Sequence, residues 1–378
     1  MKIEDFIHLL GVDFYTGVPD SLLRPLCDYL YDAYGVNNEH HIVAANEGNA
    51  AAIGAGYYLA TKKVPVIYLQ NSGEGNVINP LASLLSDDVY GIPVMFVIGW
   101  RGEPGIPDEP QHAQQGKVTL KLLETMGVPY VIVNQEMTVR ELQVQIQPLR
   151  QVLNEGRQAA LVICKGGLTN EQKIKHTNNN PLTRENIIHA VAETAGDNPI
   201  VSTTGKASRE LYEYREGKGQ GHGQDFLTVG SMGHSSSIAL GIALQKAEKQ
   251  IWCIDGDGAA IMHLGAMAVI GSVHPQNLIH VIIDNGAHES VGGMPTAAQD
   301  INLSLIARGC GYDVIHEAGD VNELQAALSA ISREEGLRLL IAKAAIGARK
   351  DLGRPTTSPR DNRENFMKYL MDDCRRTT

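Results

Sequence analysis

The sequence lacks the long apolar segments that mark membrane and secreted proteins. No stretch of the 378 residues approaches the roughly 18 unbroken apolar residues that a membrane-spanning helix needs. At the N-terminus, Glu4 and Asp5 precede only a short apolar run, Phe6–Leu10, so the basic start and long apolar core of a signal peptide are missing. We therefore expect a cytoplasmic protein without a membrane partner.

Cysteine is scarce, and positive charge is in deficit. The five cysteines form no CxxC pair and no metal-finger spacing, which predicts buried free thiols. Lys and Arg number 32 against 43 Asp and Glu, a formal net charge of -11, so the chain has no general attraction for nucleic acid. A site for an anionic substrate would have to be built locally. The cysteines are Cys27, Cys164, Cys253, Cys310 and Cys374.

Short β-rich runs alternate with helix-length segments almost throughout, a pattern typical of a parallel sheet with helices on both faces. The polar segment Glu171–Pro181 indicates a linker, and Thr183 with Asn186 then predicts a capped helix start. The fold class is therefore α/β, with two similar parallel-sheet domains, residues 1–175 and 182–378, and no room for a third. The strands that we expect are Val12–Tyr15, His41–Ala44, Val64–Leu69, Pro93–Ile98, Tyr130–Val133, Ala160–Cys164, Pro199–Ser202, Gln250–Asp255, Leu278–Asp284, Asp313–His316 and Leu337–Ala342, with a short amphipathic helix around Phe366–Met371.

The most informative segment begins with Gly256-Asp257-Gly258, directly after the apolar strand Ile251–Ile254. A helix-like run, Ala259–Val273, and a second apolar strand, Leu278–Ile283, then lead to Asn285. Because open α/β sheets bind ligands at the carboxyl ends of their strands, we expect Asp257 and Asn285 to lie side by side there.

The residue types in this βαβ unit suit a metal-bound diphosphate. A carboxylate and an amide are hard oxygen ligands of the kind that Mg²⁺ prefers. Gly256 and Gly258 allow a close backbone approach, and the helix start expected at Ala259 offers unpaired N–H groups. Other nucleotide motifs fit poorly, since Ile261 replaces the third glycine of a dinucleotide fingerprint and Gly205-Lys206 lacks the rest of a P-loop.

The GDG motif with Asn285 placed 28 residues after Asp257 resembles the diphosphate-binding signature of thiamin-diphosphate enzymes. That resemblance implies thiamin diphosphate and Mg²⁺ as cofactors, a pyrimidine-binding domain followed by a diphosphate-binding domain, and Asp257, Asn285 and the Ala287 carbonyl as metal ligands. It also implies a catalytic glutamate in the first domain, which activates the cofactor. Glu47 fits, because it follows the strand at His41–Ala44 and opens a helix of small residues. The alternative for Glu47 is a first-turn glutamate that complements the helix dipole.

The resemblance assigns further residues to the cofactor. The side chain of Met232 would support its bent shape and the carbonyl of Gly230 would accept from its amino group, although a methionine can also serve packing alone. Lys206 could face either the diphosphate or the substrate anion. The remaining cofactor contacts by resemblance are Gly205, Gly256, Gly258, Ala259, His288 and Ser290.

Four strings resemble the phosphonopyruvate and sulfopyruvate decarboxylases, a branch of this family. The strings are Gly17–Ser21, Trp100–Gly105 with Asp108–His112, Thr204–Leu211 and Gly286–Gly293, and Asp20 departs from the small neutral residue expected there. The resemblance implies decarboxylation of 3-phosphonopyruvate to phosphonoacetaldehyde and CO₂. Sulfopyruvate decarboxylation, another 2-keto acid decarboxylase or carboligase activity, and non-catalytic cofactor binding remain alternatives. An intact Glu47 argues against the last.

A locally basic set would recognise the substrate anion. The Gly/Pro-rich loop 99–116 carries Arg101 and His112 after a strand end, as substrate loops do. Arginine offers bidentate geometry for a carboxylate or phosphonate, and His112 is a candidate for proton transfer. The alternatives are a solvated arginine and a structural histidine. The proposed substrate set is Ser21, Arg101, His112, Lys206 and Arg209, and because the family assembles its site between two subunits, we expect a homo-oligomer, at least a dimer.

Overall fold

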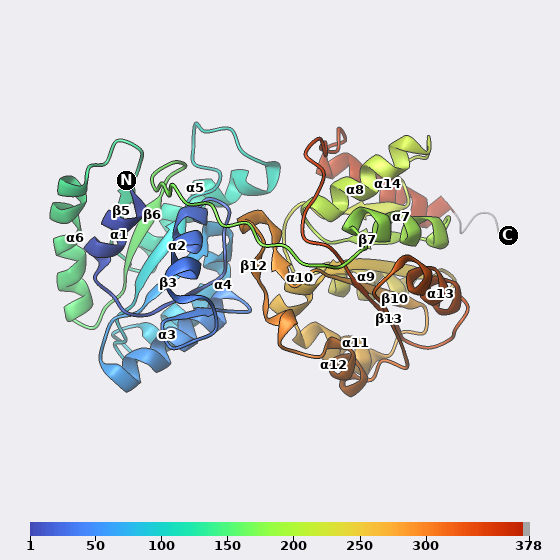
Figure 1. Cartoon of the computed structure of the whole chain (residues 1–378), viewed down its shortest axis with the longest axis horizontal. Coiled ribbons are helices and arrows are strands. Elements are labelled where there is room, and N and C mark those ends of the chain that lie inside the picture. The colour runs from blue at the N-terminus through green and yellow to red at the C-terminus, as the bar shows by residue number, and fades with distance from the viewer. Residues whose placement is uncertain (373–378) are drawn as a thin grey trace. The chain divides into compact units, whose positions relative to one another are not determined.

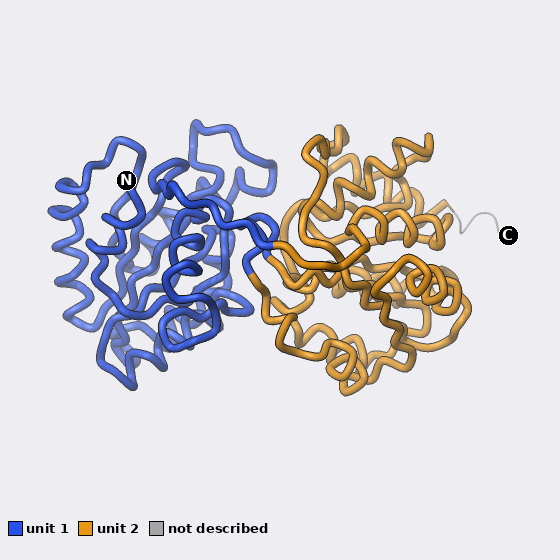
Figure 2. Tube along the Cα trace, in the orientation of Figure 1, with its two compact units in different colours: residues 1–176, 288–294 blue, residues 177–287, 295–378 orange. Residues whose placement is uncertain are grey.

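The computed structural model describes residues 1–372 and divides into two compact units (Figures 1 and 2). The first unit comprises residues 1–176 together with 288–294, and the second comprises 177–287 and the chain from 295 onward. The segment 288–294 thus packs with the first unit although it follows a strand of the second. Cys374, expected as a buried thiol, lies outside the described residues.

The first unit is built on a six-stranded parallel sheet in the order β2-β1-β3-β4-β6-β5. Successive residues of its central strands face opposite cores: Tyr68 and Val97 pack with helices α1, α2 and α6, whereas Ile67 and Phe96 pack with α3, α4 and α5. The strands are β1 (Tyr15–Gly17), β2 (His41–Val43), β3 (Val66–Gln70), β4 (Met95–Gly99), β5 (Tyr130–Val133) and β6 (Ala159–Ile163). The helices are α1 (Ile3–Leu10), α2 (Arg24–Tyr34), α3 (Glu47–Thr61), the short η1 (Asn71–Gly73), α4 (Glu74–Pro80), η2 (Leu81–Leu85), α5 (Pro110–Thr125) and α6 (Val139–Asn154).

The second unit repeats the design with the sheet order β13-β14-β10-β9-β7-β8. Helices α7 and α8 cover one side of this sheet, and α11 and α12 cover the other (Figure 1). The strands are β7 (Ile200–Ser202), β8 (Asp225–Leu227), β9 (Ile251–Gly256), β10 (Leu278–Asp284), β13 (Val314–Ala318), β14 (Arg338–Lys343) and the small pair β11 (Ala287–His288) and β12 (Met294–Pro295). The helices are α7 (Arg184–Ala195), α8 (Lys206–Gly217), α9 (Ser235–Gln245), α10 (Asp257–Met262), α11 (Gly265–Val273), η3 (Glu289–Val291), η4 (Ala297–Gln299), α12 (Leu303–Cys310), α13 (Val321–Ile331) and α14 (Pro359–Asp372).

The predicted α/β class with two parallel sheets is confirmed, and the expected strands at Tyr130–Val133 and Leu278–Asp284 match β5 and β10. The single helix expected over Ala259–Val273 is wrong. The chain forms two helices, α10 and α11, because the backbone leaves helical geometry at His263 (φ -128°, ψ 51°). The capped start at Thr183 is confirmed, since its side chain and that of Asn186 form a reciprocal capping box.

The expected set of buried thiols is confirmed for Cys27, Cys164 and Cys253, while Cys310 is only partly buried. None of the helices in the described chain is long and apolar enough to cross a membrane.

Candidate active site

In the first unit, polar side chains follow four neighbouring strands at the edge where those strands end. Asp20 comes after β1, Glu47 after β2, Asn71 after β3 and Arg101 after β4. These four strands are adjacent in the sheet order β2-β1-β3-β4. The carboxyl ends of parallel strands meet at one edge, which is where open α/β sheets place their ligands. The sheet itself therefore gathers these residues.

Glu47 is the first residue of α3 and is held in a fixed position. The helix is capped by the Asn46 side chain, which accepts a hydrogen bond from the Asn49 N–H at 2.9 Å. The Glu47 side chain is buried, and its Oε2 accepts from Asn76 Nδ2 at 2.7 Å. Gly73 makes room for it, because a Cβ there would lie 2.2 Å from Glu47 Oε1. A glutamate that only complemented the helix dipole would need neither the burial nor the partner.

Arg101 is held through both its backbone and its side chain. Asn71 binds its main chain twice, donating from Nδ2 to the Arg101 carbonyl at 2.8 Å and accepting from the Arg101 N–H at 3.1 Å. The guanidinium forms a fork with Asp108, with Nε to Oδ2 at 2.8 Å and Nη2 to Oδ1 at 2.5 Å, while Nη1 donates to Ser21 Oγ at 3.0 Å. Arg101 and Ser21, two expected substrate residues, are thus brought into contact.

The fork with Asp108 corrects the expected basic character of this loop. Hydrogen bonding to Arg101 holds the pKa of the Asp108 carboxyl well below its usual range, so Asp108 is ionised and neutralises the guanidinium. Of the three guanidinium nitrogens of Arg101, only Nη1, which lies beside Ser21, does not bond to Asp108. The sequence could not show this, because the pairing depends on how the loop between Gly102 and Asp108 turns back.

Asp20 has a structural function in the turn before α2. It is buried and accepts hydrogen bonds from the Leu22 and Leu23 N–H groups at 3.0 and 3.3 Å, and another from the Gln70 side chain. Burial raises the pKa of Asp20. Gly99 lies against it, since a Cβ there would be 2.5 Å from Asp20 Oδ2. Asp20 therefore organises the turn that carries Ser21.

His112 lies in the first turn of α5 and is buried. Its Nδ1 has no hydrogen-bond partner within the described residues. Burial, assisted by the positive charge of Arg101, lowers the pKa of His112, so the ring is neutral at pH 7. A neutral imidazole beside a cation can accept a proton in one step and return it in another.

In the second unit, Asp257 and Asn285 follow the paired strands β9 and β10, whose register sets Gly256 beside Ile283. Asp257 is buried and is the first residue of α10, so the helix starts two residues before the expected Ala259. Thr296 Oγ1 donates to Asp257 Oδ2 at 2.5 Å, and Asn285 Oδ1 accepts from the Ala287 N–H at 3.0 Å. The structure thus places all three expected metal ligands at the carboxyl ends of the adjacent strands β9 and β10.

The charges at this edge fit a divalent cation. Burial, with the neighbouring Asp284 carboxylate adding to it, raises the pKa of Asp257 to about 7. Asp284 is paired with Lys343 at 2.5 Å, whereas Asp257 makes no ion pair with any described residue. A buried carboxylate without a cationic side chain is stabilised by a metal ion, and oxygen ligands alone suit Mg²⁺.

The loops after β7 and β8 adjoin this edge. Gly205, in a left-handed conformation (φ 89°), precedes Lys206, the first residue of α8, and Arg209 follows one turn later on the same side of the helix. Thr204 Oγ1 donates to the Val229 carbonyl at 2.7 Å and so links the two loops. The structure therefore brings Gly205 and Lys206 beside the loop that leads to Gly230.

The turn that carries Met232 packs on α10. Ser231 has a positive φ of 53°, and a Cβ at Gly233 would lie 2.9 Å from the Ala259 carbonyl. Met232 itself is half-buried, as a side chain exposed to a ligand surface would be. The expected cofactor residues Gly230, Met232 and Ala259 thus belong to one group in the second unit.

His288 and Ser290 belong to the other unit of the chain. Both lie in residues 288–294, which belong to the first unit, whereas Ala287 belongs to the second. This segment is fixed to the first unit because the Gly292 carbonyl accepts from the His176 N–H at 2.9 Å. Any contact of His288 or Ser290 with a cofactor stays a prediction.

Two family models match the regions of the chain that contain the strand ends described above. The N-terminal thiamine pyrophosphate-binding domain of thiamine pyrophosphate enzymes matches residues 3–136, and the C-terminal one matches residues 203–342. The chain belongs to the thiamin-diphosphate enzyme family. No middle domain separates the two in this thiamin-diphosphate enzyme, as the sequence predicted.

This thiamin-diphosphate enzyme is similar over nearly its whole length to two kinds of decarboxylase. It is 31% identical to the phosphonopyruvate decarboxylase of Streptomyces viridochromogenes and 32% identical to that of Streptomyces hygroscopicus, in each case over 96% of this chain and 92% of the relative. It is 30% identical to the sulfopyruvate decarboxylase of Methanosarcina acetivorans, over 90% of this chain and 88% of the relative. The chain is therefore a member of the thiamin-diphosphate-dependent 2-keto acid decarboxylases.

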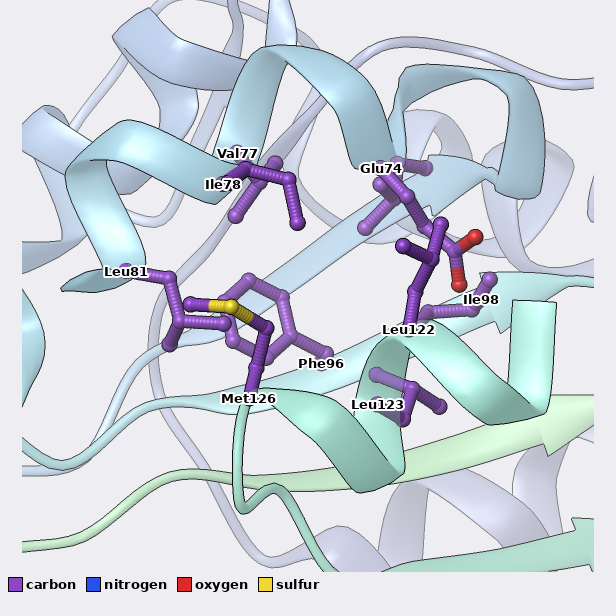
Figure 3. A pocket seen from close by; sticks show the side chains of 10 residues that line it. Glu74, Val77, Ile78, Leu81, Phe96, Ile98, Leu122, Leu123 and Met126 are labelled. Atoms are coloured by element: carbon purple, nitrogen blue, oxygen red, sulfur yellow. The ribbon is translucent and has the colours of Figure 1, made fainter. Parts of the chain in front are cut away.

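Glu74 is a buried carboxyl group of this thiamin-diphosphate enzyme that sequence reasoning missed. Glu74, the first residue of α4, points into an apolar pocket between α4 and α5, lined by residues such as Phe96 and Met126 (Figure 3). Its Oε2 accepts from Gln115 Nε2 at 2.9 Å, and its Oε1 has no hydrogen-bond partner within the described chain. Burial raises the pKa of Glu74 to about 8. Its position directly after the η1 segment gave no signal for burial, because Glu is usually exposed.

Proposed function

We propose that the chain decarboxylates 3-phosphonopyruvate to phosphonoacetaldehyde and CO₂, using thiamin diphosphate and Mg²⁺. The observation that carries the proposal is the buried Glu47 carboxylate held by Asn76, in a chain similar over 96% of its length to phosphonopyruvate decarboxylases. Thiamin diphosphate, when bound, supplies the electron sink for decarboxylation.

The residues of the chain have distinct functions in this proposal. Glu47 holds a proton at the pyrimidine ring, and its position is kept by Asn76. Asp257, Asn285 and the Ala287 carbonyl hold Mg²⁺, which the oxygen-only set at the β9 and β10 edge supports. Gly205, Gly230 and Met232 would contact the cofactor through the loops that follow β7 and β8.

Recognition of the substrate anion is assigned to Ser21 and Arg101 in the first unit and to Lys206 and Arg209 in the second. Ser21 Oγ and Arg101 Nη1 already form one hydrogen-bonded pair at 3.0 Å, so an anion that binds there meets two donors in fixed positions. Neutral His112 is the candidate for returning a proton to the product. Lys206 could serve the cofactor diphosphate or the substrate.

Sulfopyruvate is the second candidate substrate, favoured by the 30% identity to the Methanosarcina acetivorans enzyme. Phosphonate and sulfonate are both tetrahedral anions with three acceptor oxygens, and at pH 7 they differ mainly by one charge. A set of fixed donors distinguishes them less well than it distinguishes either from a methyl group.

Turnover of three substrates tests this assignment. We expect kcat/KM to fall in the order phosphonopyruvate, sulfopyruvate, pyruvate, with the last gap the widest, because each hydrogen bond to a charged group contributes about 1.5–3 kcal/mol. Arg101→Ala should narrow the gap between phosphonopyruvate and pyruvate by at least about tenfold, the equivalent of one such hydrogen bond. Arg157→Ala, which removes a surface arginine near Asp87 (3.8 Å), is the matched control. Equal loss for both substrates in Arg101→Ala would show that Arg101 does not recognise the anion.

We also propose that the active form is a homo-oligomer, at least a dimer, as the family resemblance implies. Light scattering coupled to size-exclusion chromatography of the protein with both cofactors bound measures its mass. A monomeric mass with full activity would overturn this part of the proposal.

A further inference from the structure

A second group of potential metal ligands lies within the second unit, on the face of the sheet covered by α9, α11 and α12. Cys253 and Asp255 are alternate residues of β9 and so point to the same face. His280 of β10 is the register partner of Cys253. One donor atom from each of the three residues lies within 4.8 Å of the others. All three side chains are buried, with exposed fractions of 0%, 0% and 1%.

Two of these donor atoms have no hydrogen-bond partner in the described part of the chain. They are Asp255 Oδ2 and His280 Nε2, which lie 3.5 Å apart. Buried polar atoms are almost always satisfied, because an unpaired one costs about 1–3 kcal/mol and more when it is charged. Two such atoms that face each other beside a thiol indicate a missing partner common to both.

The other ring nitrogen of His280 is already oriented as in metal sites. Nδ1 lies 3.2 Å from the hydroxyl oxygen of Tyr312, which can fix the ring with Nε2 directed at Asp255 and Cys253. Metal-binding histidines nearly always use their second nitrogen in this way. The hydroxyl of Ser235, at the start of α9, is also buried without a hydrogen-bond partner in the described residues and offers a further ligand.

We propose that Cys253, Asp255 and His280 bind one transition-metal ion of the Zn²⁺ class. A thiolate, an imidazole and a carboxylate are a donor set typical of Zn²⁺ and unsuited to Mg²⁺, which prefers oxygen alone. The charges balance, because a divalent ion offsets one thiolate and one carboxylate in a site closed to water. Metal bonds of about 2.0–2.3 Å place tetrahedral ligands roughly 3–4 Å apart, so small side-chain rotations bring the three atoms into position.

Such an ion would brace the segment that carries Asp257. Asp255 Oδ1 accepts from the Gly256 N–H at 3.0 Å, and Gly256 directly precedes Asp257. The site is therefore structural and distinct from the proposed Mg²⁺ site, from which it differs in ligand chemistry. It does not depend on which keto acid the enzyme uses.

Metal analysis of the full-length protein tests the proposal. After dialysis against Mg²⁺ buffer, we expect about one equivalent of zinc per chain by mass spectrometry, and growth on Co²⁺ should give the thiolate-to-cobalt charge-transfer absorption of a cysteine ligand. Cys253→Ser and His280→Gln should each lower the bound metal at least about tenfold, as loss of a ligand does. Cys164→Ser, a change at another buried thiol, is the control and should keep the metal.

Two results would overturn it. One is wild-type protein with less than a tenth of an equivalent of any transition metal and no charge-transfer band when Co²⁺ is supplied, which would leave Asp255 and His280 as a metal-free pair. The other is metal content unchanged in soluble Cys253→Ser protein. If that variant does not fold, the metal content and cobalt spectrum of the wild-type protein decide alone.

Discussion

Glu47 and Glu74 occupy corresponding positions in the first unit, yet their surroundings give them different properties. Each is the first residue of a helix that follows a strand end, and each is buried. Glu47 accepts a hydrogen bond from Asn76 next to Gly73, whereas Glu74 points into an apolar pocket and leaves one oxygen unpaired. Glu47 therefore has a fixed hydrogen-bond partner for its buried carboxyl group, as its proposed catalytic function requires, whereas Glu74 lies among apolar side chains.

Glu47→Gln should retain the cofactor and lose catalysis. The amide keeps the shape of the side chain but cannot transfer a proton, so we expect kcat and the rate of cofactor C2-hydrogen exchange to fall by about 10²–10⁴-fold. Binding of thiamin diphosphate should change little, because the diphosphate is assigned to the second unit. Glu74→Gln, the same change in a buried first-turn position, should leave both rates near wild type. Wild-type C2 exchange in Glu47→Gln would remove the assigned function.

Glu74→Gln should instead change how stability depends on pH. Burial raises the pKa of Glu74 from 4.5 to about 8, so between those values the folded state binds more protons than the unfolded state. Stability therefore decreases as pH rises through this window, by an amount on the order of 2–4 kcal/mol. The variant lacks this term, and its Tm should exceed that of wild type by more at pH 8 than at pH 5. Tm differences that are equal at both pH values would show that Glu74 is not destabilised by burial.

At the residue scale, sequence reasoning identified site residues that directly follow a strand. It missed residues that reach the site only because a loop folds back toward it. Glu47, Arg101, Asp257 and Asn285 each follow an apolar run, so their positions were predictable. Asp108 and Thr296 were not, because they reach Arg101 and Asp257 through loop returns. The sequence prediction of a basic substrate set therefore did not include the Asp108 carboxylate that pairs with Arg101.

At the scale of elements, the apolar runs predicted most strands. The exceptions in the two six-stranded sheets are strands that contain a closely packed glycine or a buried charged residue. β1 is displaced from the expected Val12–Tyr15 to Tyr15–Gly17, because Gly17 must approach β3: a Cβ there would lie 2.0 Å from the Tyr68 carbonyl. Strand β8 was not predicted, because it begins with the charged residue Asp225. Asp225 can be buried in this strand because Arg215 donates two hydrogen bonds to its carboxylate. The C-terminal helix, expected only around Phe366–Met371, begins at Pro359.

The loop that carries Arg101 is closed against helix α5, which carries His112, by two glycines in contact. A Cβ at Gly116 would lie 1.7 Å from the Gly102 carbonyl, and the Trp100 indole donates to the Gly116 carbonyl at 2.9 Å. Gly116→Ala should therefore push the loop away from the start of α5.

For Gly116→Ala we expect a loss of about 1–3 kcal/mol in the free energy of unfolding. We also expect a higher KM for phosphonopyruvate with little change in thiamin diphosphate affinity. Gly56→Ala, at an exposed helix position with no atom within 4 Å, is the control and should be neutral or stabilising by about 0.5–1 kcal/mol. An unchanged KM in a correctly folded Gly116→Ala protein would show that the loop does not contact the substrate.

At the scale of the whole molecule, the proposed functional residues are divided between the two units. The first unit holds Glu47 and Arg101, and the second holds Asp257, Asn285 and Lys206. Each unit has a hydrophobic core on either face of its own sheet. The proposed function therefore assigns residues of both kinds of unit to one cofactor, as the family resemblance implies.

Binding of the cofactors should stabilise the protein by mass action. At a free concentration about 100 times Kd, a ligand that binds only the folded state adds about 2.7 kcal/mol. We expect thiamin diphosphate to raise Tm when Mg²⁺ is present and to do so far less when Mg²⁺ is absent. Asp257→Asn should abolish the Mg²⁺-dependent part of this rise in Tm. An equal rise without the metal would show that Mg²⁺ does not bridge the diphosphate and the protein.

The most direct measurement of the central claim is CO₂ release from 3-phosphonopyruvate by protein stripped of metal and thiamin diphosphate and then reconstituted. We predict no release above background from the stripped protein or from protein given either cofactor alone. With both cofactors, CO₂ and phosphonoacetaldehyde should form in equal amounts, and Glu47→Gln should reduce both together. Full activity after exhaustive removal of the cofactors, or no CO₂ from phosphonopyruvate by the reconstituted wild-type enzyme, would contradict the account.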